Sequence, residues 1–369
     1  MIWYYVILAL LVYPMLYAYI GYIRDVDMRN VILVISIGLL TIFMSCRADS
    51  VGADTCQYTW GFERIADVPW SRLLTTKIYG MWGGYELNFE YGYRVYNKLV
   101  SVISEHSQAI IISNGILIMI LLGMLIKGYS PYVFLSIWLY VTLGVYQTQM
   151  NMARNAIAIF ICYNGIKYIE NRDLKKYLIC ICIATTFHVS SVLFIPVYWL
   201  AAIRLTDKKI WVIIAFLCSV GFLFSLIRQI IVQFLPFGFG RYFIGNTTKF
   251  ESLVVGAFHL MLVLFIFFFT ERQKRADIFE TEAVGIWMLI IEILFFCIGY
   301  DVASAARMAA LFGPYLIVFV PRLIETGIGS KDERLNVIAM VTILSGIQYI
   351  VRLQMNNIGA TIPYKFFWS

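Results

Sequence analysis

Charged side chains are scarce in this chain. Only 14% of its 369 residues are Asp, Glu, Lys or Arg, and only three are histidine. Because a soluble domain carries roughly a quarter charged residues, this composition excludes an ordinary soluble enzyme. The net charge of +7 does not indicate nucleic-acid binding, since basic loops on one side of a membrane account for such an excess.

The chain also lacks the short motifs that hold nucleotides, phosphates or metals in many enzymes. It has no P-loop, no nucleophile elbow, no HExxH pair and no Gly-rich dinucleotide fingerprint. None of its seven cysteines stands at a zinc-binding spacing. We therefore expect neither a metal ion nor a cofactor. Cys46 and Cys56 flank the start of a polar stretch, and a disulfide between them is left open.

Apolar residues make up 61% of the chain and form long, continuous runs. Continuous runs favour membrane-spanning helices, because the strands of a membrane barrel alternate apolar and polar residues. The sequence predicts an all-α polytopic membrane protein of about 12 transmembrane helices, organised as a single domain over 1–369. The expected spans are 2–22, 30–46, 108–126, 131–147, 151–169, 174–187, 188–203, 209–233, 252–270, 283–300, 304–322 and 335–355.

The apolar segment 174–203 is too long for one span and short for two. His188 lies near its middle, which predicts two shortened helices that meet there. Twelve spans place 16 of the 29 basic residues in the loops of one side, 7 in the short loops and tail of the other, and 6 in the stretch 47–107. By the positive-inside rule, both termini and the stretch 47–107 are then extracytoplasmic.

The stretch 47–107 is the one sizeable extramembrane loop of this threading, and it is rich in Gly, Tyr and Trp. Exposed aromatic rings with scattered carboxylates suit carbohydrate, because rings stack on the C–H faces of sugars. The alternative is an aromatic belt at the membrane interface. The sequence leaves both interpretations open.

The few ionisable residues that interrupt the apolar runs map to the same, outer face of the predicted bundle. Several arginines with two carboxylates and a histidine suit a polyanionic, lipid-linked substrate, because guanidinium groups match phosphate oxygens. This pattern predicts a membrane-embedded transferase that acts on a lipid diphosphate. The residues are Arg47, Asp54, Glu90, Arg154, His188, Arg241 and Arg307.

Asp54, Glu90 and His188 are the candidates for a general base that removes the proton of an attacking sugar hydroxyl. The alternative for either carboxylate is that it only pairs with an arginine and holds it in place. His188 has a structural alternative as well. Four neighbouring polar side chains are expected to contact substrate: Tyr58, Tyr93, Asn97 and Asn155.

Arg154 and Arg307 are the expected diphosphate ligands, assisted by Arg47 or Arg241. Arginine in or beside hydrocarbon is costly, so it faces the bundle interior and has a partner. Arg307 has a structural alternative, which is an ion pair with Asp301. Two further polar residues lie within spans: His259, with no charge nearby in sequence and assigned to structure, and Glu292, with no obvious partner.

These residues, in this order, resemble the EpsG family of Wzy-type bacterial polysaccharide polymerases. The resemblance rests on Arg47 with Gly52-Ala-Asp54-Thr-Cys-Gln-Tyr58, on Glu90-Tyr-Gly-Tyr93 and on Arg154. It continues with Phe187-His188-Val-Ser-Ser before a helix that bears Pro196, and with Arg307 before Pro314-Tyr315. It covers nearly the whole chain. The spacing from Arg47 to Gly52 is one residue longer than the usual pattern of the family.

The resemblance implies a GT-C-like bundle in the bacterial cytoplasmic membrane, with its active site on the extracytoplasmic face. It implies that donor and acceptor are glycans linked to undecaprenyl diphosphate, and that the growing glycan moves to the next repeat unit. We expect a metal-independent, direct displacement that inverts the anomeric carbon. The implied product is a surface polysaccharide such as an O-antigen, capsule or exopolysaccharide. A need for a chain-length regulator protein stays open.

Three other functions stay open at this point. An O-antigen ligase-like transferase shares the donor and differs in its acceptor. A flippase or transporter of lipid-linked oligosaccharide would carry coupling carboxylates within its spans and two related halves, but only Glu292 fits and no repeat is visible. A membrane O-acyltransferase would need a catalytic histidine, for which only His188 is available.

Overall fold

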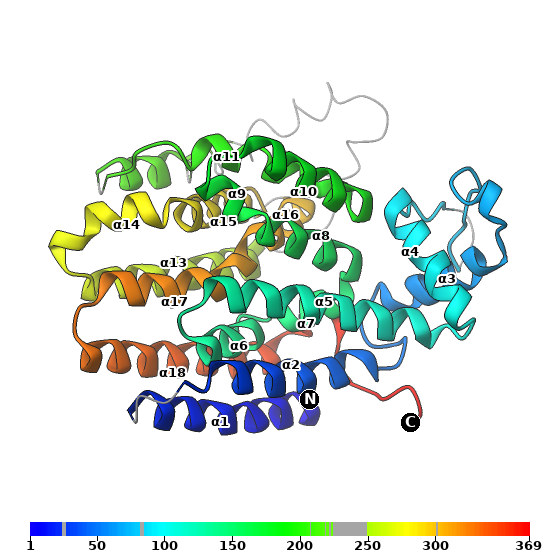
Figure 1. The fold of residues 1–369 in the computed structure, drawn as a ribbon, viewed down its shortest axis with the longest axis horizontal. Helices are drawn as coiled ribbons and strands as arrows, with labels where there is room; N and C mark the ends of the chain where they lie inside the picture. Colours follow the sequence, from blue (N-terminus) through cyan, green and yellow to red (C-terminus); the bar gives the residue numbers. More distant parts are fainter. Residues whose placement is uncertain are drawn as a thin grey trace. The chain divides into compact units, whose positions relative to one another are not determined.

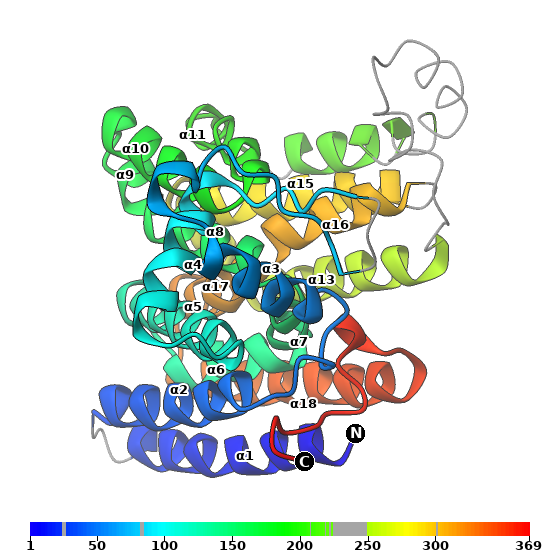
Figure 2. The same ribbon diagram turned by 90° about the vertical axis from the view of Figure 1, so that its right-hand side faces the viewer.

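The computed structural model describes residues 1–23, 27–81, 85–206, 208–217, 219–220, 223, 249–299 and 302–369. Throughout these residues the chain is helical or connects helices, and its β-structure is limited to two isolated bridges, Arg47 with Phe366 and Tyr79 with Glu86. Figures 1 and 2 show the helices from two directions. The chain divides into two compact units, Met1–Ile195 with Thr342–Ser369, and Pro196–Val341. The prediction of one domain is not tested by this division and stays a prediction.

The first unit contains both ends of the chain. Its helices run along the sequence with short connections. They are α1 Ile2–Ile23, α2 Arg29–Ser45, α3 Thr55–Asp67, η1 Trp70–Arg72, α4 Tyr91–Ile103, α5 Gln108–Tyr129, α6 Val133–Thr142, α7 Val145–Asn151, α8 Ala153–Asn164, α9 Ile166–Glu170, α10 Leu174–Phe187, η2 Val189–Phe194, part of α18 Lys331–Met355, and η6 Ile358–Ala360.

The second unit is formed by the middle of the chain. Its described helices are α11 Val197–Leu200, α13 Lys249–Phe269, η4 Arg272–Lys274, α14 Arg275–Thr281, α15 Ala283–Gly299, α16 Ala303–Phe312, η5 Gly313–Tyr315, α17 Leu316–Gly327 and the start of α18. Helix α15 packs against both α13 and α16. Val255, Phe296 and Ala309 form a buried apolar cluster where these three helices meet.

Several helices have the length and composition of membrane spans. Among the described residues, Gln108–Tyr129, Ala305–Gly327 and Lys331–Met355 are long and apolar enough to cross a bilayer. The bent pair Leu253–Phe269 and Arg272–Thr281 is a fourth candidate, and further apolar helices are shorter. The predicted all-helical polytopic membrane protein is confirmed at this level, and the count of twelve spans stays a prediction.

The stretch 47–107, expected as a loop, folds into two helices of the first unit. Helices α3 and α4 pack against each other and against α5, and Figure 1 shows them beside one end of α5. Phe62, Val100 and Ile110 join them in a small buried cluster. Both helices are amphipathic, so each buries one stripe of apolar side chains against its neighbours.

Three helix interruptions of the first unit bear on the site described below. Helix α4 begins after Glu90, whose backbone is extended (φ −64°, ψ 153°). Met152 breaks the path from α7 to α8 (φ −108°, ψ 53°), and His188 separates α10 from η2 (φ −156°, ψ 122°). The predicted break at His188 is therefore confirmed. Such breaks leave main-chain polar groups without helical partners.

Candidate active site

The first sequence motif lies against the break that precedes Arg154. Gly52 adopts a φ of +97°, and a Cβ at this position would lie 3.2 Å from the Cα of Asn151, so a left-handed turn and a close approach both require glycine. The backbone N–H of Asp54 donates to the side-chain oxygen of Asn151 at 2.8 Å. Asp54 therefore lies at the start of α3, and its segment is bound to Asn151, which is three residues before Arg154.

Glu90 binds both other ionisable groups of the site. Its Oε1 lies 2.9 Å from Nδ1 of His188 and accepts the backbone N–H of Val189 at 3.2 Å. Its Oε2 accepts a hydrogen bond from Nη1 of Arg154, and the two side chains form an ion pair. Glu90 thereby joins the starts of α4 and α8 to the break after α10.

The Arg154 side chain contacts a main-chain carbonyl and three aromatic rings besides Glu90. Its Nη1 also donates to the carbonyl of Asn88 at 3.0 Å. Its guanidinium carbon lies 4.8 Å from the ring centre of Phe89 and 5.8 Å from those of Tyr58 and Tyr93. Aromatic faces attract a cation and shield it from water. The guanidinium is therefore fixed and partly desolvated, as an anion-binding group should be.

The charge state of Glu90 determines which nitrogen of His188 carries a proton. Burial raises the pKa of Glu90, but hydrogen bonding from His188 and the charge of Arg154 outweigh it, and the net pKa lies below the usual 4.5. Glu90 is ionised at neutral pH, and a carboxylate only accepts hydrogen bonds. In the tautomer that donates to this carboxylate, Nδ1 of His188 carries the hydrogen and Nε2 is the proton acceptor.

The three side chains are shielded but reachable. The exposed fractions are 26% for His188, 19% for Arg154 and 17% for Glu90. A substrate at this surface could therefore contact all three side chains. Across the described residues no group of three or more metal-binding side chains gathers.

Comparison with protein families shows which family this chain belongs to. The sequence profile described as the EpsG family matches residues 30–366. The chain belongs to the EpsG family. No curated protein and no solved structure matches it. EpsG is a Wzy-type polysaccharide polymerase family, so membership supports a membrane-embedded protein of polysaccharide polymerisation. The matched range includes all three interruptions that meet at Glu90.

Arg47, expected to bind diphosphate in this EpsG protein, is part of the scaffold instead. Its side chain is only 1% exposed. The guanidinium donates to the carbonyls of Met44 and Met150, the latter at 2.9 Å, and the Arg47 carbonyl accepts from Gln108 at 3.0 Å. A group that is buried and bonded to main chain on two helices cannot also reach a lipid diphosphate, so we assign Arg47 to holding α2 against the α7–α8 break.

Other predicted substrate contacts are also buried. Tyr93 has no exposed surface, and its hydroxyl accepts a hydrogen bond from Asn114 at 3.0 Å. Asn97 is equally buried and donates to the Tyr93 carbonyl at 2.7 Å. Tyr58 and Asn155 are each 5% exposed. Of these four residues, Tyr58 and Tyr93 border the Arg154 guanidinium.

The remaining predicted residues are placed differently. Asp54 is exposed at the start of α3. Arg307 is exposed on α16 of the second unit, and its binding of diphosphate stays a prediction. Arg241 and Asp301 lie outside the described residues. Cys46 and Cys56 are free thiols.

The sequence interpretation missed the residues that hold the main chain of the site. Arg94 directly follows the Glu90-Tyr-Gly-Tyr93 motif, and it donates to the carbonyl of Phe89 at 2.8 Å and to that of Thr76 at 2.7 Å. Arg94 and Arg154 thus hold neighbouring carbonyls of the 88–89 segment. The sequence shows that Arg94 is a basic residue next to a family motif. Its spacing in the sequence does not show that its side chain binds main-chain carbonyls.

Gly92 sets the distance between α4 and the end of α10. A Cβ at this position would lie 2.9 Å from the backbone oxygen of Thr186, as well as on its side chain. Gly92→Ala is therefore expected to push α4 away, cost about 1–3 kcal/mol of stability and separate Glu90 from His188, so that polymer synthesis falls. Gly38→Ala is the control, because nothing lies within 4 Å of that Cβ. Equal activity of the two variants would contradict the close approach.

The lowered pKa of Glu90 makes the free energy of unfolding depend on pH, and the direction of the shift determines the direction of that dependence. Because Glu90 is more acidic in the folded chain, its pairing stabilises the fold fully above the unfolded value near 4.5 and ceases to do so as pH falls through the lower folded value. In detergent, the unfolding temperature of the wild type should exceed that of Glu90→Gln at neutral pH. The difference between the two temperatures should shrink below about pH 4.5. A pH-independent difference would show that the ionised carboxylate is not responsible.

Proposed function

We propose that this EpsG protein polymerises oligosaccharide repeat units that are linked to undecaprenyl diphosphate. The observation that carries the proposal is the Glu90 carboxyl group that contacts both Arg154 and His188. One anion-binding group and one proton acceptor, fixed by the same carboxylate, are the two functions that transfer of a glycan from a lipid diphosphate requires. The family supports the polymerase reaction class.

In the proposed reaction the acceptor hydroxyl attacks the anomeric carbon of the donor glycan. A new glycosidic C–O bond forms as the anomeric C–O bond to the diphosphate breaks, and the configuration inverts. The hydroxyl proton passes to Nε2 of His188, while Glu90 holds the ring through Nδ1 and stabilises the imidazolium that results. The bond electrons leave with the lipid diphosphate, whose growing negative charge is stabilised by Arg154.

Asp54 is the second candidate for the proton acceptor. Its side chain is exposed, and its segment is bound to Asn151 close to Arg154. Its charge also reaches the buried ring of Tyr58, whose pKa is raised chiefly by burial and further by Asp54. We assign Asp54 to binding the acceptor sugar, because an exposed carboxylate beside the Arg154 segment can accept hydrogen bonds from sugar hydroxyls.

The loop charges support an extracytoplasmic active site in the bacterial cytoplasmic membrane. The Glu90 site lies at the end of α5 that begins with Gln108, which binds the carbonyl of Ser45 at 2.8 Å. The other end of α5 carries Lys127 and belongs to the basic, cytoplasmic set of loops. Donor and acceptor then both arrive in the outer leaflet, and the partners are two lipid-linked glycans.

The test is incubation of purified protein in nanodiscs with a synthetic undecaprenyl-diphosphate repeat unit, followed by gel and mass analysis. A ladder at repeat-unit spacing is the expected result. His188→Gln should lower the rate by about 100- to 10,000-fold, and Asp54→Asn should mainly raise the acceptor concentration needed. Absence of any ladder from folded wild type would overturn the polymerase, and transfer to a different acceptor would favour the ligase-like alternative.

A further inference from the structure

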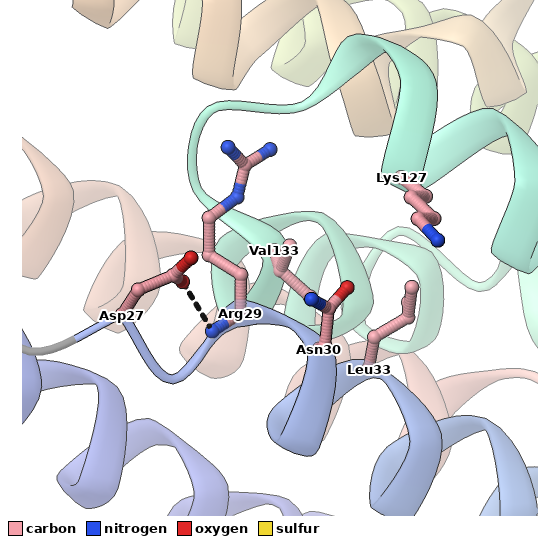
Figure 3. Close-up of a pocket in the computed structure, with 6 residues that line it drawn as sticks. All are labelled: Asp27, Arg29, Asn30, Leu33, Lys127 and Val133. Carbon is pink, nitrogen blue, oxygen red and sulfur yellow. Dashed lines mark hydrogen bonds between the residues drawn. The ribbon is translucent and has the colours of Figure 1, made fainter.

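A small cavity with two basic residues lies at the far end of the first unit from the Glu90 site. It has a volume of about 150 Å³ and is lined by Asp27, Arg29, Asn30, Leu33, Lys127 and Val133. Asp27 precedes α2, and the other residues come from the first half of α2, the end of α5 and the start of α6. In the view of Figure 3 the Asn30 amide lies between Arg29 and Lys127. The proposed reaction uses none of them.

The α2–α5 pair places this cavity and the Glu90 site at opposite ends. At one end Gln108 at the start of α5 binds the Ser45 carbonyl at the end of α2. At the other, Arg29 at the start of α2 donates to the Ser130 carbonyl after α5 at 2.7 Å. The 17 residues of α2 span about 25 Å, close to the thickness of the hydrocarbon core of a bilayer. The cavity therefore lies at the opposite membrane face.

The charges of the cavity favour a singly charged anion. Among the described residues that line it, Arg29 and Lys127 provide two positive charges and Asp27 provides one carboxylate, whose Oδ1 accepts the backbone N–H of Arg29 at 3.0 Å. The bond to Ser130 holds the Arg29 guanidinium in place. The Lys127 ammonium is exposed, and no partner for it is present in the described part of the chain. The net charge of +1 matches a phosphate diester, and the small volume excludes a glycan chain.

The surface that leads to the cavity favours a phosphate that belongs to a lipid. Ile116, Ile120 and Met124 precede Lys127 at helical spacing on one face of α5, and they are 44%, 53% and 56% exposed. In a membrane protein such an apolar stripe contacts acyl chains, and it ends at the ammonium of Lys127. Leu33 and Val133 add apolar surface to the lining of the cavity. An anion with hydrocarbon attached fits this arrangement, whereas a free ion would not use the stripe.

We infer that this cavity binds the phosphate diester headgroup of an anionic phospholipid in the leaflet opposite the Glu90 site. Arg29 and Lys127 bind the phosphate oxygens, the Asn30 amide donates to the headgroup, and the acyl chains lie along the exposed face of α5. Basic pockets between helices at the cytoplasmic side of membrane proteins bind anionic lipids in this manner. The inference concerns binding alone and does not depend on the polymerase reaction.

Native mass spectrometry of full-length protein with added phosphatidylglycerol tests this site directly. Lys127→Gln is expected to weaken the tightest lipid adduct by about five- to tenfold, since one phosphate-binding charge is lost. Lys175→Gln is the matched control, because Lys175 is an exposed lysine at the start of α10 and lies outside the cavity. Thermal unfolding of each variant without lipid establishes that both are folded.

Two further arms separate the sources of the phosphate. Phosphatidylcholine should bind wild type and Lys127→Gln alike, because its headgroup has no net charge. Inorganic phosphate at the same concentration should not displace the phosphatidylglycerol adduct. Displacement by inorganic phosphate would show an anion site without lipid selectivity, and equal loss in Lys127→Gln and Lys175→Gln would show general surface attraction. Either result overturns the proposal.

Discussion

Arg154→Ala should reduce polymer formation by about 100- to 1,000-fold and leave single repeat units on the lipid. The magnitude is that of removing one group that stabilises charge developing in the transition state. Arg154→Lys should also impair the reaction, because an ammonium cannot bind Glu90, the Asn88 carbonyl and a phosphate in the planar geometry of a guanidinium. The measurement is the rate of ladder formation by purified protein with a defined lipid-linked repeat unit.

Arg64→Ala is the matched control for Arg154. The Arg64 guanidinium also lies over an aromatic ring, that of Trp60, at 4.5 Å, but its side chain is exposed on α3. It should leave the ladder unchanged. If folded Arg154→Ala protein still forms polymer at the wild-type rate, Arg154 does not have the anion-binding role.

Glu90→Gln extends this test to the whole network. Because Glu90 positions both partners, its loss should cost nearly as much as the loss of Arg154, and the double variant little more than either single one. Additive losses would indicate that Arg154 and Glu90 act independently.

The second large effect concerns stability, not catalysis. His259 and Glu292 form a buried pair between α13 and α15, with Nδ1 of His259 2.7 Å from Oε1 of Glu292. Glu292→Ala or His259→Ala leaves one polar group buried without its partner. Each is expected to destabilise the protein by about 3–5 kcal/mol, which thermal unfolding and the yield of folded protein would both report.

A paired replacement separates this mechanism from a requirement for the two residues themselves. His259→Leu combined with Glu292→Met removes both polar groups and should restore most of the stability, because packed apolar residues substitute well for a buried ion pair. Methionine resembles glutamate in length and shape, which matters because the Glu292 carboxyl lies against Gly313. Glu280→Ala on the exposed side of α14 should change little. A double variant as unstable as the singles would contradict the explanation.

The elements that local sequence determines were predicted well. The length of the 174–203 segment and the position of His188 located a break that the structure has at that residue. The φ of +97° at Gly52 is local in the same sense, because glycine adopts this conformation readily. Both features depend on a few neighbouring residues, because chain length and backbone sterics act locally.

The predictions that failed depended on which distant residue completes a contact. His259 and Glu292 each appeared to lack a partner, since 33 positions separate them. Arg47 was expected to face the substrate, but its guanidinium is used by carbonyls of α2 and of the segment before Met152. Polarity at the end of an apolar run shows that a residue needs a partner, and it does not show whether that partner is a ligand or the main chain.

The partners of Glu90 illustrate the same limit. The sequence offered two roles for this carboxylate, proton acceptor or partner of an arginine, and spacing alone could not choose between them. The structure places it against Arg154 and His188, 64 and 98 positions away, which supports the second role. Nothing local to the Glu90 motif specifies these two residues.

The meeting of three helix interruptions at Glu90 also bears on how tightly the site is specified. Main-chain groups released at a helix end must find another partner, and here the Val189 N–H and the Asn88 carbonyl find side chains of the site itself. The starts of α4 and α8 and the break at His188 are therefore joined through one carboxylate. A displacement of any one of the three segments is transmitted to the other two.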